Sequence, residues 1–363
     1  MAIVERVLQI LREGSAASTY KHAVLIALMD LCVERTAADG SAPQSVTTRQ
    51  LATKVIELYW DQTRPFGGGG GAILQQTTQR GSSIPSWIQK LRQKVEDDVG
   101  CTLSPARARL ADATSWTTLV DNVEVRLIEM PLAKLQRVAG EDHPWLYALS
   151  WDDGAHKPTH DSVQTYQRGE DSDFDNVVRL QPGVGECLSR LHSLMRPFVQ
   201  QEWTRMVAKC SKMEESKLHG FLFGANRKAL EAVRQPLADL QQGRCFYCGG
   251  RLGMNAHVDH FLPWARFAED GLANLVVADA RCNGNKRDHL PAHSFVEKWR
   301  QRTRGQRSEL VRLSGQLQWQ LAEDEALGTA RAAYYRLPAD TRLWAGRDEW
   351  LAIDLEALRK ALA

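Results

Sequence analysis

The sequence CFYCGG at residues 245–250 is followed by HVDHFLP at residues 257–263 and by NLVVADARCNGNKRD at residues 274–288. The second segment predicts a short strand that ends in a turn, and the third predicts another strand followed by a helix. A loop at residues 268–271 separates the two strands. The order strand, loop, strand, helix can bring polar side chains from separate elements to one place.

Cys245 and Cys248 form a Cys-x-x-Cys pair followed by two glycines. A two-residue spacer lets both thiolates face one ion, and the small residues leave room for backbone N–H groups to point at sulfur. The pattern therefore predicts a zinc knuckle, with two unpaired structural cysteines as the alternative. The chain has seven cysteines, and an odd number suits a reducing compartment better than a set of disulfides.

Asp259 and His260 stand side by side where the first strand ends, and Asn283 lies in the helix. A hard oxygen ligand and an imidazole are thus placed where the chain leaves the strand, with an amide on the helix. The predicted elements let these side chains converge on one divalent cation.

Residues 244–290, about one-eighth of the chain, resemble the HNH endonucleases of the ββα-metal superfamily, found in homing endonucleases, restriction enzymes and nuclease toxins. The resemblance rests on Cys-x-x-Cys, Val-Asp-His-x-x-Pro, Asn-Leu and Cys-Asn-x-x-Lys in the family's order and spacing. It implies that Asp259 is the first ligand of the catalytic metal and Asn283 the second. It also implies that His260 is the general base.

Two further residues take roles from the same resemblance. Asn274 matches the asparagine that braces the active-site loop. Lys286 matches a family lysine one helical turn after Asn283, where it can reach a phosphate.

The zinc site departs from the family pattern. Members with this site usually carry a second Cys-x-x-Cys, whereas here Asp279 stands three residues before Cys282. A carboxylate can complete a tetrahedral zinc site, so the expected ligands are Cys245, Cys248, Cys282 and Asp279. His289 is the rival fourth ligand, and a module without zinc is the remaining alternative.

The residue types suit phosphodiester hydrolysis. A hard cation such as Mg²⁺ or Mn²⁺, held by Asp259 and Asn283, stabilises the charge that gathers on phosphate oxygens. His260 can take a proton from the attacking water, because an ordinary histidine is partly neutral at physiological pH. His257 shares the strand face of Asp259, where it either orients water or is a plain hydrogen-bonded strand histidine.

A basic stretch follows the motif. Residues 298–312 contain six basic residues and one acidic residue, a local charge of +5. If this stretch is helical, Arg300, Arg304 and Arg307 share one face, which predicts either a surface that contacts phosphates or a solvated helix face.

The N-terminal residues predict helices. Residues 20–33 read YKHAVLIALMDLCV, and Thr47 and Gln50 have the spacing of a capping box ahead of apolar residues at helical spacing. Two short helices joined by a turn suggest a helix-turn-helix or winged-helix unit, with an ordinary helical subdomain as the alternative. The glycine run of residues 67–71 predicts a loop or hinge, and no Lys-Ser/Thr follows it to support a phosphate-binding loop.

The middle of the chain predicts a small sheet and a long helix. Residues 123–127, 146–151 and 176–180 have the composition of strands, and residues 152–175 predict a solvated loop. Apolar residues at helical spacing mark one stripe across residues 184–210, the strongest amphipathic pattern in the sequence.

The predicted helices and short strands together indicate a mostly helical α+β chain. Its 363 residues favour two or three units over one. The predicted segments are a helical, winged-helix-like domain at 1–113, a small α+β region at 114–235, a ββα-metal nuclease module at 236–300 and a helical extension at 301–363. The formal charge of the whole chain is only +2, so any surface that binds nucleic acid must be a local cluster of basic residues. No apolar run approaches the length of a membrane helix, and the N-terminus lacks a basic patch leading into an apolar signal core. The sequence therefore predicts a cytoplasmic protein.

The resulting hypothesis is a metal-dependent HNH endonuclease that acts in bacterial restriction or anti-phage defence, with DNA favoured over RNA. The N-terminal regions would select the substrate or dock a partner protein of a defence system. The rivals are a zinc-stabilised nucleic-acid-binding module without catalysis and an effector nuclease that a partner activates.

Overall fold

The computed structural model describes residues 2–12, 18–67, 71–78, 83–99, 104–137, 144–151, 158–224 and 227–363. The protein is α+β, and helices predominate in it. It forms two compact units, one of Met1–Cys32 and Pro43–Gly224, the other of Val33–Ala42 and Ala225–Ala363. Two units thus stand where the sequence suggested four segments.

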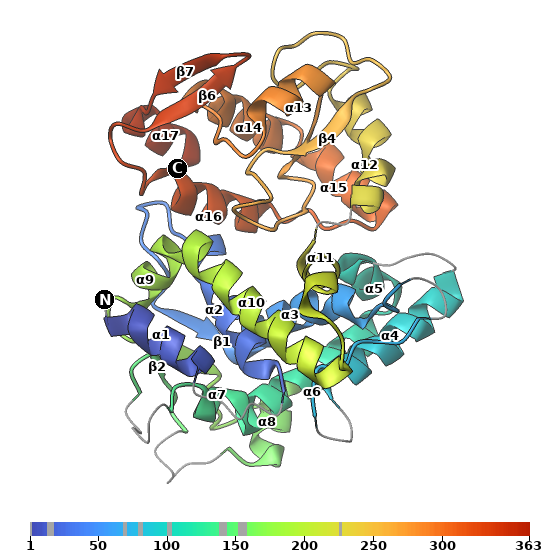
Figure 1. Ribbon diagram of the computed structural model, residues 1–363, viewed down its shortest axis with the longest axis vertical. Helices are drawn as coiled ribbons and strands as arrows, with labels where there is room; N and C mark the ends of the chain where they lie inside the picture. Colours follow the sequence, from blue (N-terminus) through green and yellow to red (C-terminus); the bar gives the residue numbers. More distant parts are fainter. Residues whose placement is uncertain are drawn as a thin grey trace. The chain divides into compact units, whose positions relative to one another are not determined.

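The first unit is mainly helical (Figure 1). Its elements are α1 (Ala2–Arg12), α2 (Tyr20–Glu34, whose last two residues count with the second unit), β1 (Ser45–Thr47), α3 (Thr48–Trp60), η1 (Asp61–Thr63), α4 (Ile84–Val99), α5 (Pro105–Ala111), α6 (Ala113–Glu129), α7 (Pro131–Leu135), β2 (Tyr147–Ala148), α8 (His160–Gln167), β3 (Val177–Leu180), α9 (Val184–Arg190), α10 (His192–Ser211), η2 (Glu215–Lys217) and α11 (His219–Phe223).

Helix α2 lies at the centre of the first unit. Every residue from Ala23 to Met29 is fully buried, so the helix is apolar all round rather than on one face. Helix α3 begins with the predicted capping box: the Thr47 side chain accepts from the Gln50 backbone, and the Gln50 side chain accepts from the Thr47 backbone. Both predicted helices are confirmed.

A small antiparallel sheet has the strand order β1-β3-β2. Two of its strands lie in the predicted segments 146–151 and 176–180, whereas β1 was not predicted. The third predicted strand, residues 123–127, is wrong: these residues belong to α6. Trp116, Leu119, Val123 and Leu127 bury one face of that helix, and this longer helical spacing overrides the short alternation.

Two other expectations need correction. The predicted loop at 152–175 contains α8, and its residues 152–157 lie outside the described part of the chain. The amphipathic stripe is carried by two helices, because α9 ends at Arg190 and α10 begins at His192. Within the glycine run, residues 68–70 also lie outside the described residues.

Residues 33–42 explain why α2 and α3 do not form a tight helix-turn-helix. Such a motif joins its helices by three or four residues, but here residues 35–44 and β1 intervene. Residues 33–42 belong to the second unit and contact α16 (Glu323–Tyr334) there. A Cβ on Gly328 of α16 would lie 1.8 Å from the Glu34 carbonyl oxygen. The winged-helix interpretation stays a prediction.

The second unit contains the strands and helix expected from residues 257–288. Its elements are α12 (Arg227–Leu240), β4 (His257–His260), β5 (Leu275–Ala278), α13 (Ala280–Lys286), α14 (His293–Gly305), α15 (Arg307–Leu317), α16, β6 (Arg342–Gly346), β7 (Glu349–Ala352) and α17 (Leu355–Leu362) (Figure 1).

Strands β4 and β5 pair antiparallel, with Asp259 opposite Val276 and His260 opposite Leu275. Strand β5 is buried on both faces, since Val276 packs in one apolar cluster with residues of α14, α16, β6 and α17. Val277 packs in another cluster with residues of α12 and α15. Burial on both faces accounts for the continuous apolar run Leu-Val-Val-Ala.

The C-terminal extension is not purely helical, which corrects the prediction for 301–363. Strands β6 and β7 form a hairpin whose turn uses Gly346 and Arg347, both with positive φ. Its fully buried Trp344 joins the cluster that contains Phe261 of the nuclease motif. The motif and the extension therefore share one core.

No helix in the described residues is sufficiently long and apolar to cross a membrane.

Candidate active site and metal centre

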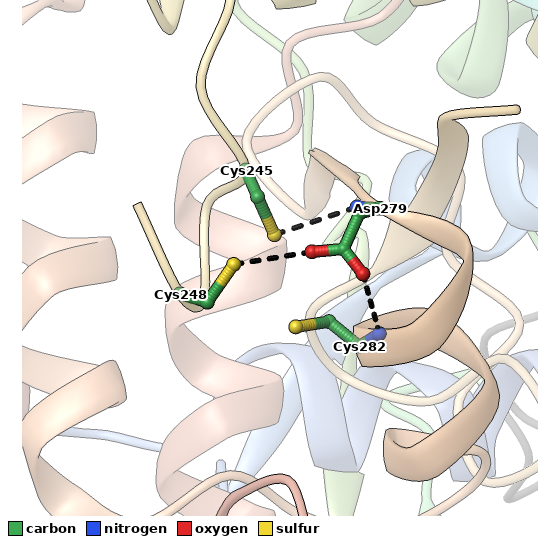
Figure 2. A group of neighbouring side chains, drawn as sticks. All are labelled: Cys245, Cys248, Asp279 and Cys282. Carbon is green, nitrogen blue, oxygen red and sulfur yellow. Dashed lines mark hydrogen bonds between the residues drawn. The ribbon is translucent and has the colours of Figure 1, made fainter. Parts of the chain in front are cut away.

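The knuckle and the start of α13 bring four potential metal ligands together (Figure 2). The sulfur atoms of Cys245, Cys248 and Cys282 and a carboxylate oxygen of Asp279 all lie within 4.8 Å of one another. This is the predicted set of zinc ligands. His289, the rival fourth ligand, is outside this group, and its ring packs edge-on against Trp350 at 4.7 Å between centroids.

Local backbone geometry explains this convergence. Asp279 is the N-cap of α13 and accepts a hydrogen bond from the Cys282 backbone at 2.9 Å, so the cap places both residues at the helix start. The knuckle is closed by Cys245 N–H donating to the Gly250 carbonyl at 2.8 Å and by Gly249 N–H donating to the Cys245 carbonyl at 3.0 Å. Gly249 has φ +70°, which glycine adopts without strain.

The electrostatics of this cluster suit a cation. Burial raises the pKa of the Cys282 thiol, and the neighbouring Asp279 carboxylate adds to the rise. Burial alone would also raise the pKa of Asp279, but the Cys282 backbone N–H and the surrounding thiols lower it overall. The Cys248 thiol donates to Asp279 at 3.1 Å. A metal ion with a preference for sulfur and tetrahedral geometry can replace these protons, because the thiolate is the ligand form.

Asp259 lies on β4 with its side chain only 9% exposed. The Tyr247 hydroxyl donates to its Oδ2 at 2.6 Å, and the Lys286 ammonium lies 3.1 Å from Oδ2 and 3.3 Å from Oδ1. Lys286 also donates to the His260 carbonyl at 2.7 Å. These contacts hold the carboxylate in a defined orientation.

Lys286 itself corrects an expectation. Its side chain is fully buried, and burial lowers its pKa although Asp259 opposes that shift. A lysine enclosed in this way does not reach a phosphate in solution. Its ammonium serves Asp259 and the β4 backbone instead.

His260 is largely buried and pairs with a carboxylate in the loop between the two strands. Its Nε2 lies 2.6 Å from Asp270 Oδ1, and its ring lies 5.3 Å from the Trp264 ring. An Nε2–H that donates to Asp270 leaves Nδ1 as the basic nitrogen. Burial raises the pKa of the adjacent Glu269 well above its ordinary value.

Asn274 is fully buried and ties this loop to the end of β4. Its Oδ1 accepts from the Leu262 backbone at 2.8 Å, and its Nδ2 donates to the carbonyls of Leu262 at 3.2 Å and Glu269 at 3.0 Å. A buried amide with three satisfied hydrogen bonds holds both backbone segments in place. The contacts agree with a bracing role.

Asn283 lies on α13, one turn before Lys286. Residues three apart share a helix face, and Lys286 reaches Asp259, so Asn283 lies on the face of α13 that approaches β4. In the described residues its side chain makes no hydrogen bond. His257 is exposed on the same face of β4 as Asp259.

The three arginines do not form the expected single face. Helix α14 ends at Gly305, and Arg307 begins α15, so the three residues are not on one helix. Arg300 is only 6% exposed, Arg304 donates to the Ala363 carbonyl at 2.8 Å, and Arg307 pairs with Glu323 at 3.0 Å. Their predicted phosphate contact has no support in this arrangement.

Two residues of this site were not found from the sequence. Asp270 is a loop residue with no motif of its own, and its backbone is held from the C-terminal extension, where the Trp319 indole donates to its carbonyl at 2.6 Å. Gly271 next to it has no space for a side chain, since a Cβ would lie 2.4 Å from Ala322. Tyr247 stands inside the Cys-x-x-Cys spacer, and nothing in that pattern indicates a contact with Asp259.

A paired-strand and helix unit with a cysteine knuckle defines an HNH-type module in the second unit, and residues 245–292 match the family model for HNH endonuclease. Residues 2–222, more than half of the chain, match the model of a domain of unknown function, DUF8808, and the chain belongs to that family. No curated protein and no solved structure matches the chain.

Proposed function

We propose that the protein is a metal-dependent endonuclease that hydrolyses phosphodiester bonds in DNA. The observation that carries this proposal is the juxtaposition of the His260–Asp270 pair with the anchored carboxylate of Asp259 on one strand end. His260 takes the proton of the attacking water, and Asp270 fixes the orientation of the imidazole ring.

Asp259 and Asn283 would hold the catalytic cation, for which Mg²⁺ or Mn²⁺ is the suitable class because both ligands are hard oxygens. The residual exposure of the Asp259 carboxylate and the unengaged side chain of Asn283 within the described residues fit such an ion. When bound, the cation supplies charge stabilisation at the phosphate oxygens. The cluster of three cysteines and Asp279 would hold a structural zinc ion.

The role we assign is bacterial restriction or anti-phage defence. It rests on the combination of a compact HNH module with a larger unit of its own fold, which would select the DNA or dock a partner protein. Plating efficiency of phages on cells with the intact protein or with His260→Ala tests this role.

The activity is tested with the purified full chain on plasmid DNA and on RNA, in Mg²⁺, Mn²⁺ or EDTA. We expect DNA cleavage that EDTA abolishes and that His260→Ala lowers by about 10²- to 10⁴-fold, the range of a general base. His289→Ala is the matched control, since its ring packs on Trp350 and is not part of the cluster of potential metal ligands. Cleavage by His260→Ala at the wild-type rate would contradict the assignment.

A further inference from the structure

One hydrogen bond joins the two proposed metal sites. Tyr247 lies between Cys245 and Cys248 in the knuckle, and its hydroxyl donates to Asp259 Oδ2 at 2.6 Å. The same residue that completes the knuckle spacer therefore orients the carboxylate proposed to bind the catalytic cation.

The Tyr247 ring has little freedom to move. It is 6% exposed and is surrounded edge-on by Trp344 at 4.9 Å, Phe246 at 5.2 Å and Phe295 at 5.3 Å between centroids. Aromatic contacts of this geometry stabilise one ring position. The three neighbouring aromatic rings thus fix the Tyr247 ring in a position from which its hydroxyl reaches Asp259.

The backbone of the knuckle is anchored as well. The Phe246 N–H donates to the Val277 carbonyl of β5 at 2.9 Å, and the Lys298 ammonium donates to the Phe246 carbonyl. Since β5 pairs with β4, the knuckle is attached to the strand that carries Asp259.

Helix α13 makes a second connection. Its first turn supplies Cys282 to the cysteine cluster, and its last residue, Lys286, contacts both oxygens of Asp259. A metal ion in the cluster would hold the knuckle and α13 together, and with them the donors that orient Asp259.

We propose that Tyr247 is a positioning residue for Asp259, and that through it metal in the Cys245/Cys248/Asp279/Cys282 cluster raises the affinity of the active site for its divalent cation. This inference rests on the proposed function. Without the hydroxyl, Asp259 keeps Lys286 but loses its shortest hydrogen bond, so the carboxylate must be ordered when the cation binds. Residues that hold metal ligands in place commonly contribute about 10- to 100-fold to metal affinity.

The test compares Tyr247→Phe with Tyr334→Phe in the full-length protein. Tyr334 is a suitable control because it is fully buried in the same cluster, and its hydroxyl donates to the Pro291 carbonyl at 2.8 Å rather than to Asp259. Zinc content, thermal unfolding and Mn²⁺ binding by calorimetry are measured for both variants, for Asp259→Ala and for wild type. The Mn²⁺ dependence of cleavage is measured in parallel.

We expect Tyr247→Phe to retain zinc and to bind Mn²⁺ about 10- to 100-fold more weakly, with cleavage restored at saturating Mn²⁺. Tyr334→Phe should bind Mn²⁺ as the wild type does. Zinc-depleted wild-type protein that remains folded should show the same loss as Tyr247→Phe.

Wild-type Mn²⁺ affinity in Tyr247→Phe, together with weakened binding in Asp259→Ala, would overturn the inference and leave the proposed nuclease intact. Unchanged binding in Asp259→Ala would show that Asp259 is no ligand, and both proposals would fall. An equal loss in Tyr334→Phe would also overturn the inference, because it would assign the effect to general packing.

Discussion

His260 and Asp270 form a carboxylate–imidazole pair with Nε2 and Oδ1 2.6 Å apart. Such a pair selects one tautomer of the imidazole and holds its ring in one orientation, and the other nitrogen is then the one that can accept a proton. The loop that carries Asp270 is itself fixed by the Asn274 amide and by the Trp319 indole. The proposed base is therefore positioned by residues from two segments, the loop between β4 and β5 and the C-terminal extension.

Asp270→Asn should lower the rate of DNA cleavage by about 10²-fold or more, because an amide no longer selects the required tautomer. Mn²⁺ binding and zinc content should stay at wild-type values, since Asp270 contacts neither proposed metal site. Single-turnover cleavage at saturating Mn²⁺ measures the effect. Asp340→Asn, an exposed carboxylate on the same unit, is the control, and equal rates for both variants would exclude a role for Asp270.

Helix α13 shows how one short element serves both sites. Asp279 caps it, Cys282 lies in its first turn, and Asn283 and Lys286 share a face three residues apart. Its N-terminal end is directed to the cysteine cluster and its C-terminal end to β4. Loss of the Asp279 cap or of the Cys282 thiol should therefore disturb the whole of α13 and not a single contact.

Cys245→Ser should lose bound zinc and lower the unfolding temperature, because metal binding stabilises a folded site that the unfolded chain lacks. His289→Ala should retain zinc, since its ring lies against Trp350 and outside the cluster. Elemental analysis and thermal unfolding of both variants check this expectation. Loss of zinc in His289→Ala with retention in Asp279→Ala would reverse the choice of fourth ligand.

At the scale of the molecule, the nuclease motif does not form its core alone. Trp344, Tyr334, Leu358 and Leu362 of the C-terminal extension pack in one cluster with Phe261 and Tyr247. A small strand–strand–helix unit buries too little apolar surface to be stable by itself, and the extension supplies the missing surface. The extension also places Trp319 against the loop of Asp270.

Trp344→Ala should reduce the free energy of unfolding of the second unit by about 3–5 kcal/mol, the usual cost of truncating a buried aromatic side chain. Leu351→Ala on the other strand of the same hairpin should change it by less than about 0.5 kcal/mol, since Leu351 is 44% exposed. Chemical unfolding followed by tryptophan fluorescence and circular dichroism measures both. Similar effects of the two substitutions would argue against a shared core.

Features that depend on neighbours in the chain were predictable. The strand–strand–helix order of residues 257–288, the α3 capping box and the four residues of the cysteine cluster all follow from spacings within a few dozen residues. The apolar run of α2 was equally clear, because its length exceeds that of a strand. Local periodicity and ligand spacing suffice in these cases.

Features that depend on burial or on distant segments were not predictable. Residues 123–127 alternate as a strand does, but the buried face of α6 makes them helical. Lys286 and Arg300 carry charge that the sequence assigns to a surface, yet packing encloses both. The Tyr247 ring packs against Trp344, and the backbone of Asp270 is held by Trp319. Both partners are distant in the sequence, and only the folded chain brings these segments together.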